Sequence, residues 1–204
     1  MTPEISRLSP SRMIGRAVVA LLIAVCVTAC TSKSDTQLAS DSLQNGLEAQ
    51  ASGMLDQAAT DYSDCVKHDS GNKFCLYDLG TVEQAQGDTV GAEANYRLAL
   101  VTDPNYAPAI FNLAILRAQA GASAEAIGLY REYVKLMPKD AAGHLNIGLL
   151  LIQTGDTTEG NAQVAQALAL DPSLKSRLAS PSRASTSPAP SPKSSAKASP
   201  KPSA

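Results

Sequence analysis

The sequence contains no tryptophan, only two histidines and two phenylalanines, and aromatic residues make up 4% of its 204 residues. His68 and His144 lie far apart, and neither has a cysteine or a second histidine at ligand spacing, which argues against a zinc site. The chain also lacks a glycine-rich phosphate loop, a nucleophile elbow and a carboxylate pair that stands out from solvated helix faces. The sequence therefore predicts no catalytic residues, no metal and no cofactor, and we do not expect an enzyme.

Acidic residues are missing from the C-terminal end. Residues 175–204 hold six basic residues and consist almost wholly of Ser, Pro, Ala, Lys and Arg. This composition offers too little apolar surface to offset the entropy of ordering, which predicts disorder. Residues 31–174, in contrast, hold 18 acidic and 8 basic residues, a net charge of −10 (8 − 18) that the formal −2 of the whole chain conceals.

The basic tail, residues 175–204, has three interpretations. It can be a solubilising appendage, or it can be an O-glycosylated stalk, because it combines Ser and Thr with Pro. Alternatively, its positive charge would bind anionic lipid or wall polymer in a salt-sensitive way.

One uncharged apolar run, AVVALLIAVCVTA, occupies residues 17–29 near the N-terminus. Its thirteen residues are fewer than the roughly 20 that a helix needs to cross a bilayer. Arg7, Arg12 and Arg16 precede the run and small residues end it, an arrangement typical of a secretory signal. We therefore expect an exported protein, for which nucleic acid is an unsuitable partner.

The residues Val27-Thr28-Ala29-Cys30 at the end of this run resemble the bacterial lipobox. The resemblance implies that residues 1–29 are a lipoprotein signal peptide and that the Cys30 thiol receives diacylglycerol. Two or more acyl chains would hold the protein stably at a membrane, facing the periplasm or the outer side of the plasma membrane. Residues 30–38 would then form a short polar linker. An ordinary signal peptide cut after Ala29 and an uncleaved anchor are the alternatives.

Glycines recur at a fixed interval through the middle of the chain, since Gly53, Gly87, Gly121 and Gly155 are each 34 residues apart. Other positions keep this register, and nine residues after each glycine stand Tyr62, Tyr96, Tyr130 and Val164. Each copy offers two amphipathic stretches, the first ended by the glycine and the second by Asp-Pro or a variant of it. The pattern predicts four helix pairs in which the glycine adopts the left-handed backbone that closes the first helix.

This register resembles the tetratricopeptide repeat, whose motif fits residues 39–72, 73–106, 107–140 and 141–174. The resemblance implies an all-α, right-handed superhelix of four antiparallel helix pairs, because no repeat buries its apolar face alone. It also implies a protein–protein interaction scaffold. The capping helix usual in the family has room only for about Leu174–Ser180 before Pro181. The outer face of the fourth repeat is therefore left to the tail, to a second copy in a homo-oligomer, or to another partner.

In this family the first helix of each repeat lines a concave groove that binds the partner. Its positions correspond to Leu43, Leu47, Tyr77, Thr81, Phe111, Asn112, Ile115, Leu145, Asn146, Leu149 and Ile152. None of these residues is basic, so the Lys and Arg clamp by which some members bind a C-terminal carboxylate is missing. The resemblance implies an apolar groove with amides for an extended apolar segment or amphipathic helix, although we expect about half of this stripe to be packing between helices.

Cys65 and Cys75 lie on either side of a loop between two predicted helices. Outside the cytoplasm a disulfide between them is chemically permitted, and it would link the first repeat to the second. Two buried thiols that act as small apolar residues are the alternative.

The function that these features predict is that of an envelope lipoprotein that recruits or orders other proteins, in the assembly of a secretion, pilus or wall-building machine. The alternative is a structural tether, in which the basic tail holds wall or membrane while the repeats associate with one another.

Overall fold

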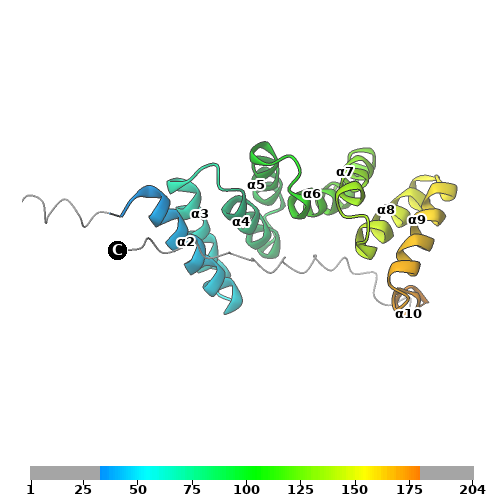
Figure 1. The fold of residues 1–204 in the computed structure, drawn as a ribbon, viewed down its shortest axis with the longest axis horizontal. Coiled ribbons are helices and arrows are strands. Elements are labelled where there is room, and N and C mark those ends of the chain that lie inside the picture. The colour runs from blue at the N-terminus through cyan, green and yellow to red at the C-terminus, as the bar shows by residue number, and fades with distance from the viewer. Residues whose placement is uncertain (1–32, 180–204) are drawn as a thin grey trace, which may run out of the picture.

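The computed structural model describes residues 33–179, and all regular structure in that range is helical. The helices are α2 (Asp35–Ala51), α3 (Leu55–His68), α4 (Lys73–Gln86), α5 (Thr89–Thr102), α6 (Ala107–Gln119), α7 (Ser123–Leu136), α8 (Ala141–Thr154), α9 (Thr157–Leu170) and α10 (Leu174–Ala179). The first eight of these form antiparallel pairs that stack in chain order along one axis (Figure 1). The prediction of an all-α stack of four antiparallel helix pairs is confirmed.

Three predictions fall outside the described residues, namely the signal peptide, the lipobox with Cys30, and the tail from residue 180 onward. At both edges of the described range, however, helices include residues that the sequence places in the linker or in the tail. Helix α2 begins at Asp35, within the predicted linker, because the Ser34 side chain caps it by accepting a hydrogen bond from the Gln37 amide. Helix α10 takes up residues 174–179, which shortens the predicted tail by five residues, 175–179.

The repeated glycines end the first helix of each pair. Their φ angles are 75° at Gly53, 89° at Gly87, 76° at Gly121 and 101° at Gly155, and no other residue in the described range has a positive φ. A side chain would strain the backbone in this left-handed region, so glycine allows the chain to reverse at these four points. The glycines therefore play the conformational role that the register predicts.

Close approach within a pair depends on a small residue facing a large one. A Cβ atom added to Gly80 of α4 would lie 2.8 Å from Cε1 of Tyr96 in α5 and 3.2 Å from the backbone oxygen of Ala92. Gly46 of α2 stands in the same relation to Tyr62 of α3. The tyrosine ring thus fills the space that the glycine leaves, which explains why a glycine and a tyrosine share these two places in the first and second repeats.

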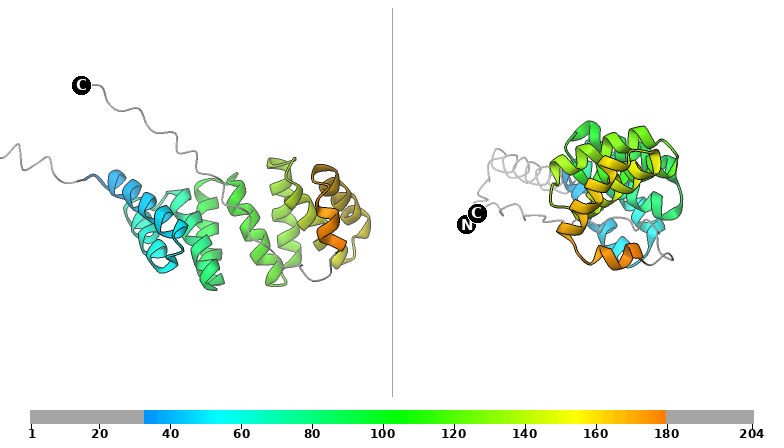
Figure 2. Two further views of the ribbon diagram at one scale, coloured as in Figure 1. Left: turned by 90° about the horizontal axis from the view of Figure 1, so that it is seen from below. Right: turned by 90° about the vertical axis from the view of Figure 1, so that its right-hand side faces the viewer.

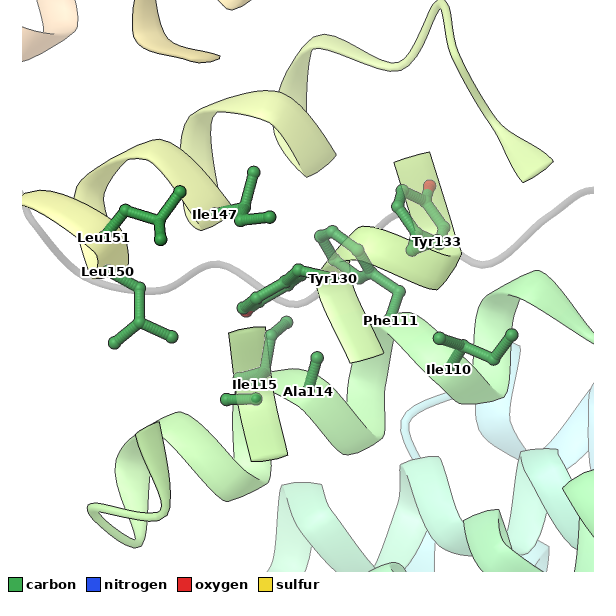
Figure 3. Packing of buried hydrophobic residues seen from close by; sticks show 10 residues of the cluster. Ile110, Phe111, Ala114, Ile115, Tyr130, Tyr133, Ile147, Leu150 and Leu151 are labelled. Carbon is green, nitrogen blue, oxygen red and sulfur yellow. The ribbon is translucent and has the colours of Figure 1, made fainter. Parts of the chain in front are cut away.

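The apolar core runs between the pairs as well as within them. Figure 3 shows the cluster at the junction of the third and fourth pairs, where side chains of α6, α7 and α8 meet. The ring of Phe111 lies 5.9 Å from that of Tyr130 and 4.7 Å from that of Tyr133, centroid to centroid. Ile147 of α8 is fully buried against this group. Each pair is therefore stabilised by its successor, as expected of a repeat protein.

Within residues 33–179 a short helix, α10, covers part of the end of the fourth pair. Helix α10 folds back beside α9 (Figure 2), where Leu174 is buried. Val164 and Leu168 of α9 stay partly exposed, and Leu170 and Leu178 are exposed. None of the helices between residues 33 and 179 combines the length and apolar character needed to span a bilayer.

Candidate partner-binding face

The first helices of the pairs, α2, α4, α6 and α8, carry the eleven residues predicted to line a groove, and we call their shared side the inner face. Four of these residues are buried and serve the scaffold itself, namely Tyr77, Phe111, Asn112 and Ile115. Phe111 and Ile115 belong to the core cluster of Figure 3, and Tyr77 packs with Tyr96 at 5.8 Å. A partner cannot reach these four side chains. They pack between helices and do not line a binding groove.

The other seven predicted residues remain accessible to different degrees. Leu149 is 45% exposed, while Leu43, Leu47, Thr81, Leu145, Asn146 and Ile152 are partly buried. Leu43 and Leu47 also pack against the core of the first pair. Leu145, Leu149 and Ile152 follow one another at helical spacing on α8 and form what we call the α8 stripe. Because the α8 stripe is apolar and open, it is the part of the predicted groove that a partner can use.

Asn112 is held by tyrosines. Its Nδ2 donates hydrogen bonds to the hydroxyls of Tyr77 and Tyr96, each at 3.3 Å, while Tyr96 donates to Oε1 of Gln84 at 2.8 Å. Asn146, one repeat later, lies beside the Tyr130 hydroxyl and partly offsets the rise that burial causes in the pKa of Tyr130. Within the described residues the Oδ1 of Asn112 is a buried acceptor that receives no hydrogen bond. The amide positions of the register are therefore mainly structural, but Asn112 leaves one acceptor unused.

Asp78 occupies the corresponding position one repeat before Asn112, and the sequence prediction did not include it. Its carboxylate is partly buried and has no hydrogen-bond or ion-pair partner among residues 33–179. Burial raises its pKa to about 7, and burial together with its charge raises the pKa of Tyr77 to about 12. The signal was present in the sequence, because the 34-residue register puts Asp78 where the next two repeats have Asn112 and Asn146.

Aromatic rings gather beside Asp78 at the N-terminal end of α4. Phe74 is 50% exposed and meets Tyr106 edge-on at 5.8 Å, and Tyr106 meets Tyr77 edge-on at 5.5 Å. Lys73 Nζ lies 5.3 Å from the Phe74 ring centre and 5.2 Å from that of Tyr106, and it pairs with Asp103 at 2.5 Å. We call Phe74, Tyr106 and Asp78 the α4 patch, an accessible aromatic surface with an unpaired carboxylate.

Cys65 of α3 and Cys75 of α4 are joined by a disulfide, with their Cα atoms 6.1 Å apart. Both residues are fully buried. The bond therefore links the first pair to the second, next to Phe74 in sequence. His144 is buried, with Nδ1 2.7 Å from Oε1 of Gln163 and Nε2 3.0 Å from the carbonyl oxygen of Pro138. Between residues 33 and 179 no three His, Cys, Asp or Glu side chains are grouped to hold a metal ion.

Comparison with curated proteins gives two partial relatives from Komagataeibacter xylinus. The chain is 29% identical over 125 residues to cellulose synthase 1 operon protein C, a match that covers 59% of this chain and 9% of the relative. It is 36% identical over 76 residues to cellulose synthase 2 operon protein C, covering 37% of this chain and 6% of the relative. The chain thus spans less than a tenth of the length of these relatives. No protein-family model matches it.

Comparison with solved structures identifies the fold. A tetratricopeptide repeat protein from Parabacteroides merdae superposes with a TM-score of 0.63 at 21% identity, over 70% of this chain and 57% of that protein. MamA from Desulfovibrio magneticus, from residue 41 to its end, gives 0.63 at 19% identity, over 66% and 76%. PilF from Pseudomonas aeruginosa gives 0.60 at 21% identity, over 69% and 64%. The four helix pairs of this chain therefore have the tetratricopeptide fold.

Proposed function

We propose that the protein is a scaffold anchored to a membrane outside the cytoplasm, and that its inner face binds an apolar segment or amphipathic helix of a partner protein. The observation that carries this proposal is the α8 stripe. Leu145, Leu149 and Ile152 are apolar residues of a first helix that stay partly or largely accessible, whereas Phe111 and Ile115, the equivalents of Leu145 and Leu149 in the preceding repeat, are buried. Three apolar anchors at helical spacing suit a partner helix or an extended apolar segment.

Two features support the location outside the cytoplasm. The Val27–Cys30 lipobox provides the lipid anchor, and the disulfide between Cys65 and Cys75 belongs to an oxidising compartment. Mass spectrometry of the mature N-terminus tests the anchor, because diacylglycerol on Cys30 adds a defined mass and Cys30→Ser abolishes it. An unmodified N-terminus at Cys30 or Thr31 would contradict the anchor while leaving the scaffold proposal intact.

A machine of the cell envelope is the setting that we propose. Both curated relatives are named for cellulose synthase operons, which supports a role beside a polysaccharide synthase. The alternative is a structural tether, in which the basic tail contacts anionic wall polymer or lipid and the fourth repeats of two copies associate. The exposed Leu170 and Leu178 near the end of the stack favour this alternative.

Capture of a partner by matched variants distinguishes the two functions. The full chain, purified in detergent, should retain one or a few specific proteins from solubilised envelopes, and Leu149→Glu should remove them. Val90→Glu is the matched control, because Val90 is exposed on α5, a second helix of its pair. Helicity and melting temperature should be equal for all three proteins. Capture that persists when Leu145 and Leu149 are both changed to Glu would show that the α8 stripe is not the binding surface.

The tether makes the opposite prediction in the same experiment. If the protein is a tether, no specific protein should bind the inner face. Sedimentation should instead show a dimer of the wild-type chain, and Leu170→Glu should abolish that dimer. A strictly monomeric chain would therefore exclude self-association through the fourth repeat.

A further inference from the structure

We propose that the chain binds its own C-terminal segment, residues 196–202 (AKASPKP), on the α4 patch, with Pro200 and Pro202 against Phe74 and Tyr106 and a lysine against Asp78. This inference goes beyond the proposed function and does not depend on it. It concerns the second repeat, whereas the α8 stripe lies in the fourth.

The aromatic part of the patch matches proline. The Phe74 and Tyr106 rings meet at an interplanar angle of 89°, so that the surface presents the edge of one ring beside the face of the other. Surfaces with such stepped aromatic rings bind Pro-rich segments, because the polyproline conformation is already extended and loses little entropy on binding. Half of the Phe74 surface is open to receive such a segment.

The polar part of the patch matches a cation. Among residues 33–179 the partly buried carboxylate of Asp78 has no counterion, and an acidic group in this position is expensive to keep charged unless a cation approaches it. The site therefore has an acceptor to offer and needs a donor, which a lysine ammonium supplies.

The neighbouring cation does not meet this need. Lys73 is the basic residue beside the rings, but its ammonium is paired with Asp103 at 2.5 Å. The Lys73–Asp103 pair is neutral overall, so it leaves Asp78 as the uncompensated charge of the patch. A second cation can therefore approach Asp78 without net repulsion.

The C-terminal segment has the complementary composition and sufficient length. It contains two prolines and two lysines without an acid, while residues 31–174 carry a net charge of −10 (8 − 18). Lys197 lies 18 residues beyond Ala179 (197 − 179) and can reach about 56 Å at 3.1 Å per residue. Five helix-to-helix steps separate α9 from α4, which amounts to at most about 50 Å at 10 Å per step. Lys197 and Lys201 can thus reach Asp78, and Lys193 falls short at about 43 Å.

Tethering makes this contact favourable even if it is intrinsically weak, because a linker of this length gives an effective concentration in the millimolar range. The consequence is competition. A partner that extends along the inner face toward α4 must displace the segment, and a wall polymer or lipid that binds the lysines would release it.

Zero-length cross-linking of the full chain tests the contact. At pH 7.5 a carbodiimide joins a lysine to a carboxylate only where the two are in contact, and mass spectrometry identifies the pair. We expect Asp78 to be joined to Lys197 or Lys201, with Lys73–Asp103 as an internal positive control. Mixing ¹⁴N-labelled and ¹⁵N-labelled chains before cross-linking distinguishes a cross-link within one chain from one between two copies. We expect each cross-linked peptide pair to carry a single isotope.

Phe74→Ser is the informative variant, because it leaves Asp78 in place and removes only an exposed ring. It should lower the Asp78 cross-link about three- to fivefold relative to Lys73–Asp103, while Leu98→Ser, an equally exposed apolar change on α5, should leave it unchanged. Circular dichroism verifies that both variants fold. Tail lysines joined to many acids without preference, a Phe74→Ser chain with the wild-type pattern, or a majority of mixed isotope pairs would each overturn the proposal.

Discussion

Reduction of the Cys65–Cys75 disulfide should destabilise the first helix pair in a way that can be calculated. The two cysteines are separated by 10 residues in sequence. The chain-entropy relation gives a loss of about 9 cal/mol/K for a loop of this size, or about 2.7 kcal/mol at 25 °C. Both cysteines are fully buried, and the two thiols that reduction creates also need more room than the bonded sulfurs, which adds to the entropic loss.

Urea unfolding followed by circular dichroism, with and without reductant, measures this loss. With an m-value of about 1.5–2 kcal/mol/M, the midpoint should fall by about 1.5 M. Because repeat stacks can lose an end first, we expect an early transition of α2 and α3 in reduced protein. The Cys65→Ala/Cys75→Ala chain is the control and should not respond to reductant. Equal midpoints for oxidised and reduced protein would refute the reasoning, and two free thiols in unfolded, unreduced protein would disprove the bond itself.

Three further predictions concern single side chains. Phe111→Glu should destabilise the third and fourth pairs by more than about 3 kcal/mol, since it puts a charge into the core, whereas Leu149→Glu should change the urea midpoint little. Gly80→Ala should cost about 1–3 kcal/mol, because its Cβ meets Tyr96 at 2.8 Å; a midpoint equal to wild type would show that the ring yields. Burial raises the pKa of Asp78 from 3.8 to about 7, so the folded state binds more protons and stability should fall as pH rises from 4 to 7, by at most about 4 kcal/mol. Urea titrations in about 1 M salt, which screens the tail, should show this fall and lose it in Asp78→Asn.

The sequence could predict the helix pairs because the features that specify them are local. The left-handed backbone at Gly87, with a φ of 89°, requires a glycine at that place in the register. The close contact between Gly80 and the Tyr96 ring likewise requires a small residue at one place and favours a large one at another. Such positions depend on neighbours within one repeat. They recur wherever the repeat recurs, and a single sequence with four copies is enough to reveal them.

Exposure on the inner face could not be predicted in the same way, because it depends on the element that packs onto each repeat from the C-terminal side. Phe111 and Leu145 share one register position, and Ile115 and Leu149 share another. Phe111 and Ile115 are buried by α7 and by Ile147 of α8, whereas in the part of the chain that the structure describes only the short helix α10 follows the fourth pair. The same pattern therefore produces core in the third repeat and accessible surface in the fourth.

This dependence on the next repeat bears directly on where a partner binds. Adding a fifth helix pair after α9 should bury the positions of Leu145 and Leu149 as α8 buries those of Phe111 and Ile115. The α8 stripe is then a property of the end of the stack rather than of the repeat, and a partner helix that packs there takes the place of a missing repeat. Such a helix would pack against the fourth pair as α8 packs against the third. Its apolar residues should therefore recur at the spacing of Ile147, Leu150 and Leu151, the residues by which α8 makes that contact.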